Sequence, residues 1–469
     1  MAQPNIVFIL IDDMGWRDLG CYGSSFYETP HIDALAAQGV RFTNAYAACP
    51  VCSPTRASIL TGKYPARLGV TDWIDWPSTT HPCRGRLVDA PYIKGLPAGE
   101  YSLAQALRDA GYATWHVGKW HLGGEGVLPT NFGFDVNVGG CEWGSPGREG
   151  YFSPWGIPAL RDVEVPEGTY LTDYLTDQAI DLIEAHDERP FFLNLWYYTV
   201  HTPIQAKAQT IDKYREKARR LGLDQVEPSE DGGPFPTEHK RHLHIQRRRV
   251  QSDPVYAAMI EHLDDNVGRL MDTLEREGRA QNTIVVFLSD NGGLATAEGS
   301  PTCNAPLAEG KGWMYEGGTR EPQFLRWPGV IPAGEVCEAV TTSTDWYPTL
   351  LDLAGLKSRP EQHLDGVSLA PLLRGEANTL ERDAIFWHYP HYGNQGGTPG
   401  CSLRAGDYKL IEFFEDGRLE LYNLRDDVSE EHNLAAEMPA LVAGLHAQLI
   451  VWRTGLEAQI PQANPKWRD

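Results

Sequence analysis

Apolar runs of strand length alternate with amphipathic stretches along most of the chain. Residues 6–11 form a continuous, β-branched apolar run, which is typical of a strand buried on both faces. Residues 191–198 and 283–288 have the same character, and residues 255–277 have the pattern of a long amphipathic helix. This alternation predicts an α/β fold in which helices sandwich a large, mixed and mostly parallel sheet.

The remaining pattern predicts further helices and strands and a change of architecture near residue 375. In the first part we expect helices at 31–38, 54–61, 102–110 and 176–186, and strands at 40–46 and 112–117. After residue 375 we expect short strands at 384–389, 401–414 and 418–424, with a hairpin turn at 416–417, and a last helix at 439–456. We therefore predict a larger α/β domain over 1–375 and a C-terminal α+β subdomain, an antiparallel sheet plus a helix, over 376–469.

Residues 206–253 interrupt the alternation. They combine charged helix formers, an acidic Pro/Gly-rich stretch and a short arginine run. Two interpretations stay open for this segment, a lid over a site or a solvated surface insertion.

Polar side chains follow three of the predicted strands where each strand ends. Asp12 and Asp13 follow the first strand, a Gly-Lys-Trp-His run at 118–121 follows another, and Asp290 and Asn291 follow a third. Ligands of open α/β sheets bind beyond the carboxyl ends of the strands, so these clusters predict one convergent site. Carboxylate and amide oxygens are suitable ligands for a hard cation. The simpler interpretation is that these Asp and Asn side chains only stabilise turns and cap backbone groups after the strands. The two pairs together favour a metal site.

Cys52 stands just ahead of a predicted helix. A helix N-terminus favours negative charge, so the position suits a thiolate or an anionic oxygen. Two interpretations of Cys52 stay open, a thiol nucleophile and a buried cysteine without a chemical role. Cys49 and Cys52 are not matched by a second cysteine pair among the eight cysteines, so the spacing predicts neither structural zinc nor a disulfide framework.

The charge balance limits the classes of partner. The chain has 41 basic and 63 acidic residues, a net charge of −22, which disfavours nucleic acid and anionic membrane. An anion site must therefore be built locally from cationic side chains and metal. We see no secretory leader and expect a cytoplasmic protein as the sequence is given, or a periplasmic or secreted one if a signal peptide was removed.

The residues around Cys52 resemble the signature of a known family. Cys-x-Pro-x-Arg at 52–56, followed by Leu-Thr-Gly-x-Tyr-Pro at 60–65, is similar to the signature of type I, formylglycine-dependent sulfatases of the alkaline-phosphatase-like superfamily. Other motifs follow in that family's order, at 12–15, 118–123, 201–203, 289–292, 310–312 and 317–322. The resemblance covers almost the whole chain.

The resemblance implies a cation and a modified cysteine. Asp12, Asp13, Asp290 and Asn291 would bind Ca²⁺, with Mg²⁺ less favoured, together with residue 52. Cys52 would be oxidised by a formylglycine-generating enzyme, and the hydrated aldehyde would attack sulfur.

The resemblance also implies roles for five further side chains. Lys119 and Lys311 would hold sulfate oxygens, His201 would protonate the leaving alcohol, and His121 would take a proton from residue 52. Arg56 would position the hydrate.

The substrate is less closely specified. The chain resembles bacterial carbohydrate and aryl sulfatases, which implies a sulfated saccharide, with aryl sulfates as artificial substrates. Candidate pocket loops are 72–86, 141–155 and 388–404, and the candidate substrate contacts in them are Trp73, His81, Arg84, His388 and Arg404. The alternatives are a phosphate or phosphonate monoester hydrolase of the same superfamily and a non-catalytic glycan-binding relative.

Overall fold

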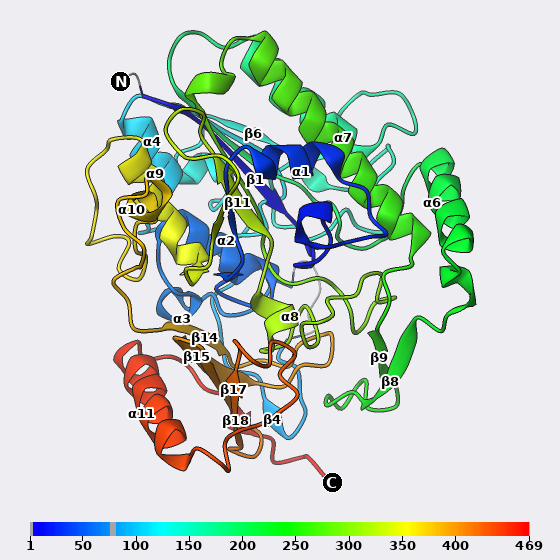
Figure 1. Cartoon of the computed structure of the whole chain (residues 1–469), viewed down its shortest axis with the longest axis vertical. Helices are drawn as coiled ribbons and strands as arrows, with labels where there is room; N and C mark the ends of the chain where they lie inside the picture. Colours follow the sequence, from blue (N-terminus) through cyan, green and yellow to red (C-terminus); the bar gives the residue numbers. More distant parts are fainter. Residues whose placement is uncertain (1–2, 76–80, 469) are drawn as a thin grey trace.

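A computed structural model describes residues 3–75 and 81–468 and is built around an eight-stranded mixed sheet (Figure 1). Its order is β12-β2-β11-β10-β1-β7-β5-β6. The strands are β1 (Asn5–Ile11), β2 (Val40–Phe42), β5 (Ala113–Gly118), β6 (Val136–Val138), β7 (Phe191–Trp196), β10 (Thr283–Ser289), β11 (Gln323–Arg326) and β12 (Glu335–Cys337). Only β11 runs antiparallel to its neighbours β10 and β2. The predicted mixed, mostly parallel sheet is confirmed.

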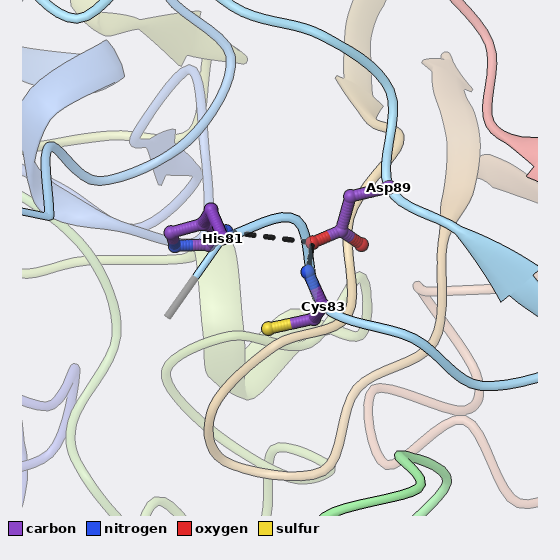
Figure 2. A group of neighbouring side chains, drawn as sticks. All are labelled: His81, Cys83 and Asp89. Carbon is purple, nitrogen blue, oxygen red and sulfur yellow. Dashed lines mark hydrogen bonds and ion pairs between the residues drawn. The ribbon is translucent and has the colours of Figure 1, made fainter. Parts of the chain in front are cut away.

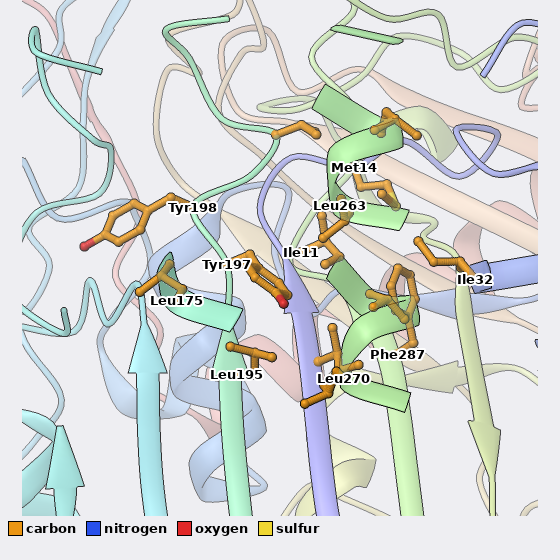
Figure 3. Packing of buried hydrophobic residues seen from close by; sticks show 14 of the residues in the cluster. Ile11, Met14, Ile32, Leu175, Leu195, Tyr197, Tyr198, Leu263, Leu270 and Phe287 are labelled. Carbon is orange, nitrogen blue, oxygen red and sulfur yellow. The ribbon is translucent and has the colours of Figure 1, made fainter. Parts of the chain in front are cut away.

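Strand β1 lies at the centre because both of its faces are apolar. Successive side chains point to opposite faces, so Ile9 and Ile11 enter one core while Phe8 and Leu10 enter the other. Each such buried side chain contributes about 1.5–3 kcal/mol to folding. Figure 3 shows the first core, where Ile11 and Phe287 pack beneath Leu263 of α7.

Two layers of helices cover the sheet. The helices that pack on the first core are α1 (Pro30–Ala37), α5 (Leu171–Glu184) and α7 (Pro254–Arg276). Those on the second core are α2 (Cys52–Thr61), α4 (Leu103–Asp109), α9 (Trp346–Leu353) and α10 (Ala370–Leu373). Two of the helices begin at capping side chains: the hydroxyl of Ser102 caps α4, and the carboxylate of Asp253 caps α7.

The C-terminal part forms a separate antiparallel sheet with one long helix. Its strands are β14 (Ile385–Tyr389), β15 (Gly400–Ala405), β16 (Tyr408–Phe413) and β17 (Leu419–Asn423), in that order. Helix α11 (Pro439–Gly455) packs on one face, at the lower left of Figure 1. The other face packs against Tyr46, Val51 and Met314 of the preceding part. The predicted smaller antiparallel sheet with a helix is therefore confirmed.

Two predicted strands are each divided in the structure. Residues 401–414 form β15 and β16 because the chain reverses between them, where Gly406 takes φ 57°. Residues 40–46 form β2 and β3 (Ala45–Tyr46), and β3 pairs with β13 (Thr341–Thr342) outside the large sheet. Helix α5 begins at Leu171, ahead of the predicted start at 176.

The 206–253 segment contains α6 (Ala208–Arg220) and a hairpin of β8 (Ser229–Pro234) and β9 (His244–Arg248), at the right in Figure 1. The short elements elsewhere are α3 (Pro65–Leu68), α8 (Glu316–Thr319), β4 (Leu87–Val88), β18 (Gln462–Ala463), and 3-10 turns at Gly20–Tyr22, Pro129–Phe132, Pro158–Leu160, Leu223–Gln225, Ala280–Asn282 and Ser343–Asp345. Over the ranges 3–75 and 81–468, no helix has the length and apolar character needed to cross a membrane.

Candidate active site

Two acidic turns meet beyond the carboxyl ends of β1 and β10. The parallel register pairs Ile11 with Ser289, so the residues that follow each strand lie side by side. The backbone N–H of Asp13 donates to Asp290 Oδ1 at 3.2 Å, and Asn291 Nδ2 donates to Asp13 Oδ1 at 2.9 Å. Asp13 has φ 63°, a left-handed conformation that aspartate tolerates better than most residues. The predicted convergence of these two pairs is therefore present in the structure.

This acidic cluster leaves oxygen atoms for a cation. Asp12 Oδ1 and Asn291 Oδ1 are buried, and neither has a hydrogen-bond partner within the described part of the chain. Donor atoms of Asp12, Cys52 and Asp290 lie within 4.8 Å of one another. Carboxylate and amide oxygens are the ligands that Ca²⁺ and Mg²⁺ prefer. The residues present thus fit a hard divalent cation.

The electrostatics of the cluster support the same interpretation. Burial raises the pKa of Asp12 to about 8, against the opposing pull of Lys119, and the neighbouring Asp290 and Asp13 raise it further. Gathering three carboxylates in a buried site is costly unless positive charge accompanies them. A divalent cation would add to the positive charge of Lys119, Lys311 and Arg56 and would favour the ionised form of Asp12.

Cys52 is the first residue of α2 and lies against the ring of His121. Its Sγ is 3.3 Å from His121 Nδ1, while His121 Nε2 donates to the carbonyl of Ile74 at 2.9 Å. The proton of the neutral ring is thus placed on Nε2, and Nδ1 presents a lone pair to residue 52. Burial, with help from Lys119, lowers the pKa of His121 well below its usual value. His121 is therefore arranged as a proton acceptor.

The thiol itself is poorly suited to act as a thiolate. Burial raises the pKa of Cys52, although Lys119 and Lys311 both act to lower it. The thiolate is the reactive form of cysteine, so a simple thiol nucleophile finds no support in this environment.

Three cationic or proton-carrying side chains surround the acidic turns. Lys119 Nζ donates to Asp12 Oδ2 at 2.7 Å, and Lys311 Nζ donates to Asp13 Oδ2 at 2.8 Å. His201 Nδ1 donates to the carbonyl of Thr202 at 2.9 Å. The other ring nitrogen, Nε2, therefore faces Asp13 Oδ2 at 3.6 Å. Burial, and then Lys311, lower the pKa of His201 to about 3. These groups can bind an anion with more than one negatively charged oxygen.

Arg56 connects the separate parts of the site. Its guanidinium is fully buried and donates to Asp290 Oδ2 at 2.9 Å and to the carbonyl of Lys119 at 3.0 Å. It also lies over the ring of Trp196 at 5.1 Å. Arg56 lies on the helix that carries Cys52. It thus holds Asp290 and the turn that carries Lys119 in place.

The candidate substrate contacts are not all brought to this site. Trp73 packs edge-on against His81, with ring centroids 5.0 Å apart, and precedes Ile74, whose carbonyl accepts from His121 Nε2. Arg84 is exposed on the same loop. Residues 76–80 of the predicted 72–86 loop lie outside the described residues.

His388 and Arg404 lie on the C-terminal sheet, where other groups engage them. His388 Nε2 donates to the carbonyl of Gln459 at 2.8 Å, and Arg404 donates to Asn44 Oδ1 at 3.0 Å and to the hydroxyl of Tyr46. No contact joins either residue to the groups around Cys52 in the described structure. Their predicted substrate role therefore finds no support, because their polar atoms are used within the fold.

Backbone groups complete the site, and the sequence motifs did not identify them. The carbonyl of Cys141 accepts the backbone N–H of His121 at 3.0 Å, and a side chain at Gly144 would lie 2.3 Å from His121 Cε1. The start of the predicted 141–155 loop thus lies against the catalytic candidate His121. A backbone carbonyl leaves no residue-type signal, whereas the run of glycines at 139–147 could have indicated a close approach.

Comparison with known proteins agrees with this arrangement. A family model described as Sulfatase matches residues 4–356, and one described as N-sulphoglucosamine sulphohydrolase, C-terminal, matches residues 309–454. A Sulfatase of Formosa agariphila is 32% identical, over 93% of this chain and 85% of that protein. The N-acetylgalactosamine-6-sulfatase of Mus musculus is 34% identical, over 87% of this chain and 71% of that protein. The crystal structure of Ps i-CgsB in complex with k-i-k-neocarrahexaose superposes with a TM-score of 0.77 and 27% identity, covering 99% of this chain and 94% of that one.

Proposed function

The chain belongs to the sulfatase family of the alkaline-phosphatase-like superfamily, and from this premise we propose that it hydrolyses sulfate esters of a carbohydrate through a formylglycine made from Cys52. The observation that carries the proposal is the position of Cys52. Its side chain begins helix α2, faces the lone pair of His121 Nδ1 at 3.3 Å and shares a donor cluster with Asp12 and Asp290.

The substrate class rests on the relatives. One is an N-acetylgalactosamine-6-sulfatase, and Ps i-CgsB was crystallised with a neocarrahexaose, so both names point to carbohydrate. Another relative, arylsulfatase J of Mus musculus, suggests that aryl sulfates serve as artificial substrates. The proposed partners are thus a sulfated saccharide and, during maturation, a formylglycine-generating enzyme that oxidises Cys52.

The residues of the site divide the chemistry among them. A divalent cation held by Asp12, Asp13, Asp290 and Asn291, Ca²⁺ before Mg²⁺, would withdraw charge from a sulfate oxygen. The hydrated aldehyde would supply one hydroxyl to attack sulfur and a second whose deprotonation releases sulfate. His121 Nδ1 lies where it can accept the proton of a hydroxyl on Cβ of residue 52.

The remaining side chains bind the sulfate and assist the leaving group. The ammonium group of Lys119 donates to Asp12, and that of Lys311 donates to Asp13. Each ammonium group can donate a further hydrogen bond to a sulfate oxygen. Both lysines lower the pKa of His201, and a bound sulfate would offset them and favour a proton on Nε2. That proton would pass to the departing sugar oxygen.

The test compares ester classes and examines residue 52 directly. Protein produced with a maturation enzyme is assayed on a sulfated saccharide, an aryl sulfate, an aryl phosphate and an aryl phosphonate. We expect sulfate esters to be turned over fastest and peptide mass spectrometry to find an aldehyde at position 52. Faster turnover of the phosphate or phosphonate would favour the other hydrolase class, and binding of saccharide without turnover would favour the non-catalytic relative. Full activity with an intact thiol would exclude the formylglycine route.

A further inference from the structure

A second cluster of metal-binding side chains lies on the loop that ends at β4 and on the turn after β14. It consists of Asp72, His81, Asp89 and His391, whose side chains are 0%, 4%, 1% and 0% exposed. None of them belongs to the acidic cluster around Asp12. Figure 2 shows His81 and Asp89 facing each other, with Cys83 on the chain between them.

The donor atoms are spaced as the ligands of a tetrahedral ion would be. His81 Nδ1 is 3.4 Å from Asp72 Oδ2 and 3.4 Å from Asp89 Oδ2, and His391 Nδ1 is 3.7 Å from Asp72 Oδ2. Bonds of about 2.0–2.2 Å from zinc to nitrogen and oxygen place neighbouring ligands about 3.3–3.6 Å apart. The distances exceed those of ordinary N–H···O hydrogen bonds, about 2.7–3.2 Å. Of the three contacts, only the long one between His81 Nδ1 and Asp89 Oδ2 qualifies as a hydrogen bond.

Two of the donors have no hydrogen-bond partner. Asp72 Oδ1 accepts from the N–H of Trp73 and from the hydroxyl of Tyr389, but the buried Asp72 Oδ2 accepts none among the described residues. His391 Nε2 is 2.8 Å from Thr71 Oγ1, while its buried Nδ1 is likewise unpaired in the described structure. An unsatisfied buried polar atom costs about 1–3 kcal/mol. Both free atoms point toward the same place.

The charges of the cluster call for a positive ion. The buried carboxylates of Asp72 and Asp89 share this site with the imidazoles of His81 and His391. The nearby Lys94 does not supply the balance, because it pairs with Asp75. A divalent ion bound by two carboxylates and two neutral imidazoles has no net charge. Such an ion would therefore compensate both buried carboxylates.

We propose that Asp72, His81, Asp89 and His391 bind Zn²⁺ at a structural site. Imidazole and carboxylate ligands with no open position suit structural zinc, whereas calcium takes oxygen ligands. The ion joins the 72–89 loop to the turn after β14. Ile74, which holds His121 through its carbonyl, lies on the same loop. Cysteine spacing gives no signal for this site, because its ligands are carboxylates and histidines from distant parts of the chain.

Metal analysis of the full-length protein tests the proposal. The chain is loaded with Zn²⁺ in excess Ca²⁺, which occupies the hard-cation site, and bound metals are counted after gel filtration. We expect about one zinc per wild-type chain. The variants Asp72→Asn and His391→Gln should lose zinc affinity by at least about tenfold and keep their calcium. His242→Gln, which removes an exposed histidine, should bind zinc as wild type does.

X-ray absorption at the zinc edge provides a readout that needs no variant. The wild-type spectrum should show nitrogen and oxygen neighbours at about 2.0–2.1 Å. A sulfur neighbour at about 2.3 Å would add Cys83, whose Sγ lies within 4.8 Å of donor atoms of His81 and Asp89. Less than stoichiometric zinc in the wild type, a shell of six oxygens, or equal zinc binding by all three variants would overturn the proposal. These outcomes concern metal content and are independent of sulfatase turnover.

Discussion

The two ring nitrogens of His121 face different atoms, and this difference sets the chemistry at residue 52. Nε2 is occupied by a backbone carbonyl, so Nδ1 is left as an acceptor at the position where a nucleophile begins helix α2. The thiol encoded at position 52 is held protonated by burial. At the scale of single residues, this arrangement supports the proposed oxygen nucleophile on the Cβ of residue 52.

Removing the side chain of residue 52 should separate catalysis from folding. We expect Cys52→Ala to lower kcat by at least about 10⁴-fold, because the proposed nucleophile is lost. Thermal unfolding and calcium titration should change little, since the acidic turns keep their own hydrogen bonds. Cys49→Ala, at another buried cysteine three residues earlier, is the matched control and should remain active. Turnover by the Cys52 variant at the wild-type rate would contradict the mechanism.

At the scale of helices and strands, the patterns that depend on burial were the most predictable. The apolar run at 6–11 became β1 because both of its faces meet a core, and the motifs at 12–13 and 290–291 met because β1 and β10 pair in parallel. The 401–414 strand was divided because Gly406 permits a reversal that an alternating pattern does not reveal. The carbonyl of Ile74 and the cluster around Asp72 depend on contacts between distant segments, for which neither spacing nor residue type gives a signal.

Strand β5 contains a buried histidine that should make the fold sensitive to acid. His116 is neutral, accepts from Asn194 Nδ2 at 3.0 Å, and has its pKa lowered by burial to about 3. The unfolded chain takes up a proton below pH 6.5 while the folded chain does not, so stability is lost as pH falls from 6.5 toward 3. Between pH 7 and 5 this linkage is worth about 2 kcal/mol.

Denaturant unfolding at pH 7 and pH 5 measures this effect. His116→Gln should lose about 2 kcal/mol less stability over the interval than the wild type, whatever its stability at pH 7. The exposed His242→Gln should follow the wild type. If the His116 variant and the wild type lose stability in parallel, the histidine is not held neutral in the fold.

At the scale of the whole molecule, a buried ionic network joins the C-terminal sheet to the rest of the chain. Lys409 Nζ, on β16, lies 3.0 Å from Glu316 Oε1 on α8 and 3.0 Å from Glu430 Oε1, and all three side chains are 0% exposed or nearly so. Tyr46 donates to the other oxygen of Glu316. Two buried carboxylates thus share one ammonium group at the boundary between the two parts of the molecule, and Glu316 also pairs with Arg320 at 3.3 Å.

Neutralising that ammonium group should be costly. Lys409→Met removes the cation that both buried carboxylates share and leaves Glu316 only its pair with Arg320, so we expect a loss of about 3–5 kcal/mol in the free energy of unfolding. Arg425→Met breaks an exposed pair with Asp407 in the same subdomain and should cost less than about 1 kcal/mol. Both values are measured by urea unfolding at neutral pH. Equal losses for the two variants would show that the network contributes no more than a surface pair.

The burial of helix α2 restricts when residue 52 can be oxidised. Cys52 is 2% exposed and every residue of α2 is buried, so the side chain of the finished protein is closed to another enzyme's active site. One of the segments around Cys52 is β10, which pairs with β1 although paired residues are 278 positions apart in the sequence. During synthesis the peptide therefore stays reachable until most of the chain has emerged. Protein folded with an intact thiol should resist later conversion, whereas the same protein unfolded by denaturant should be converted, as mass spectrometry of the two samples would reveal.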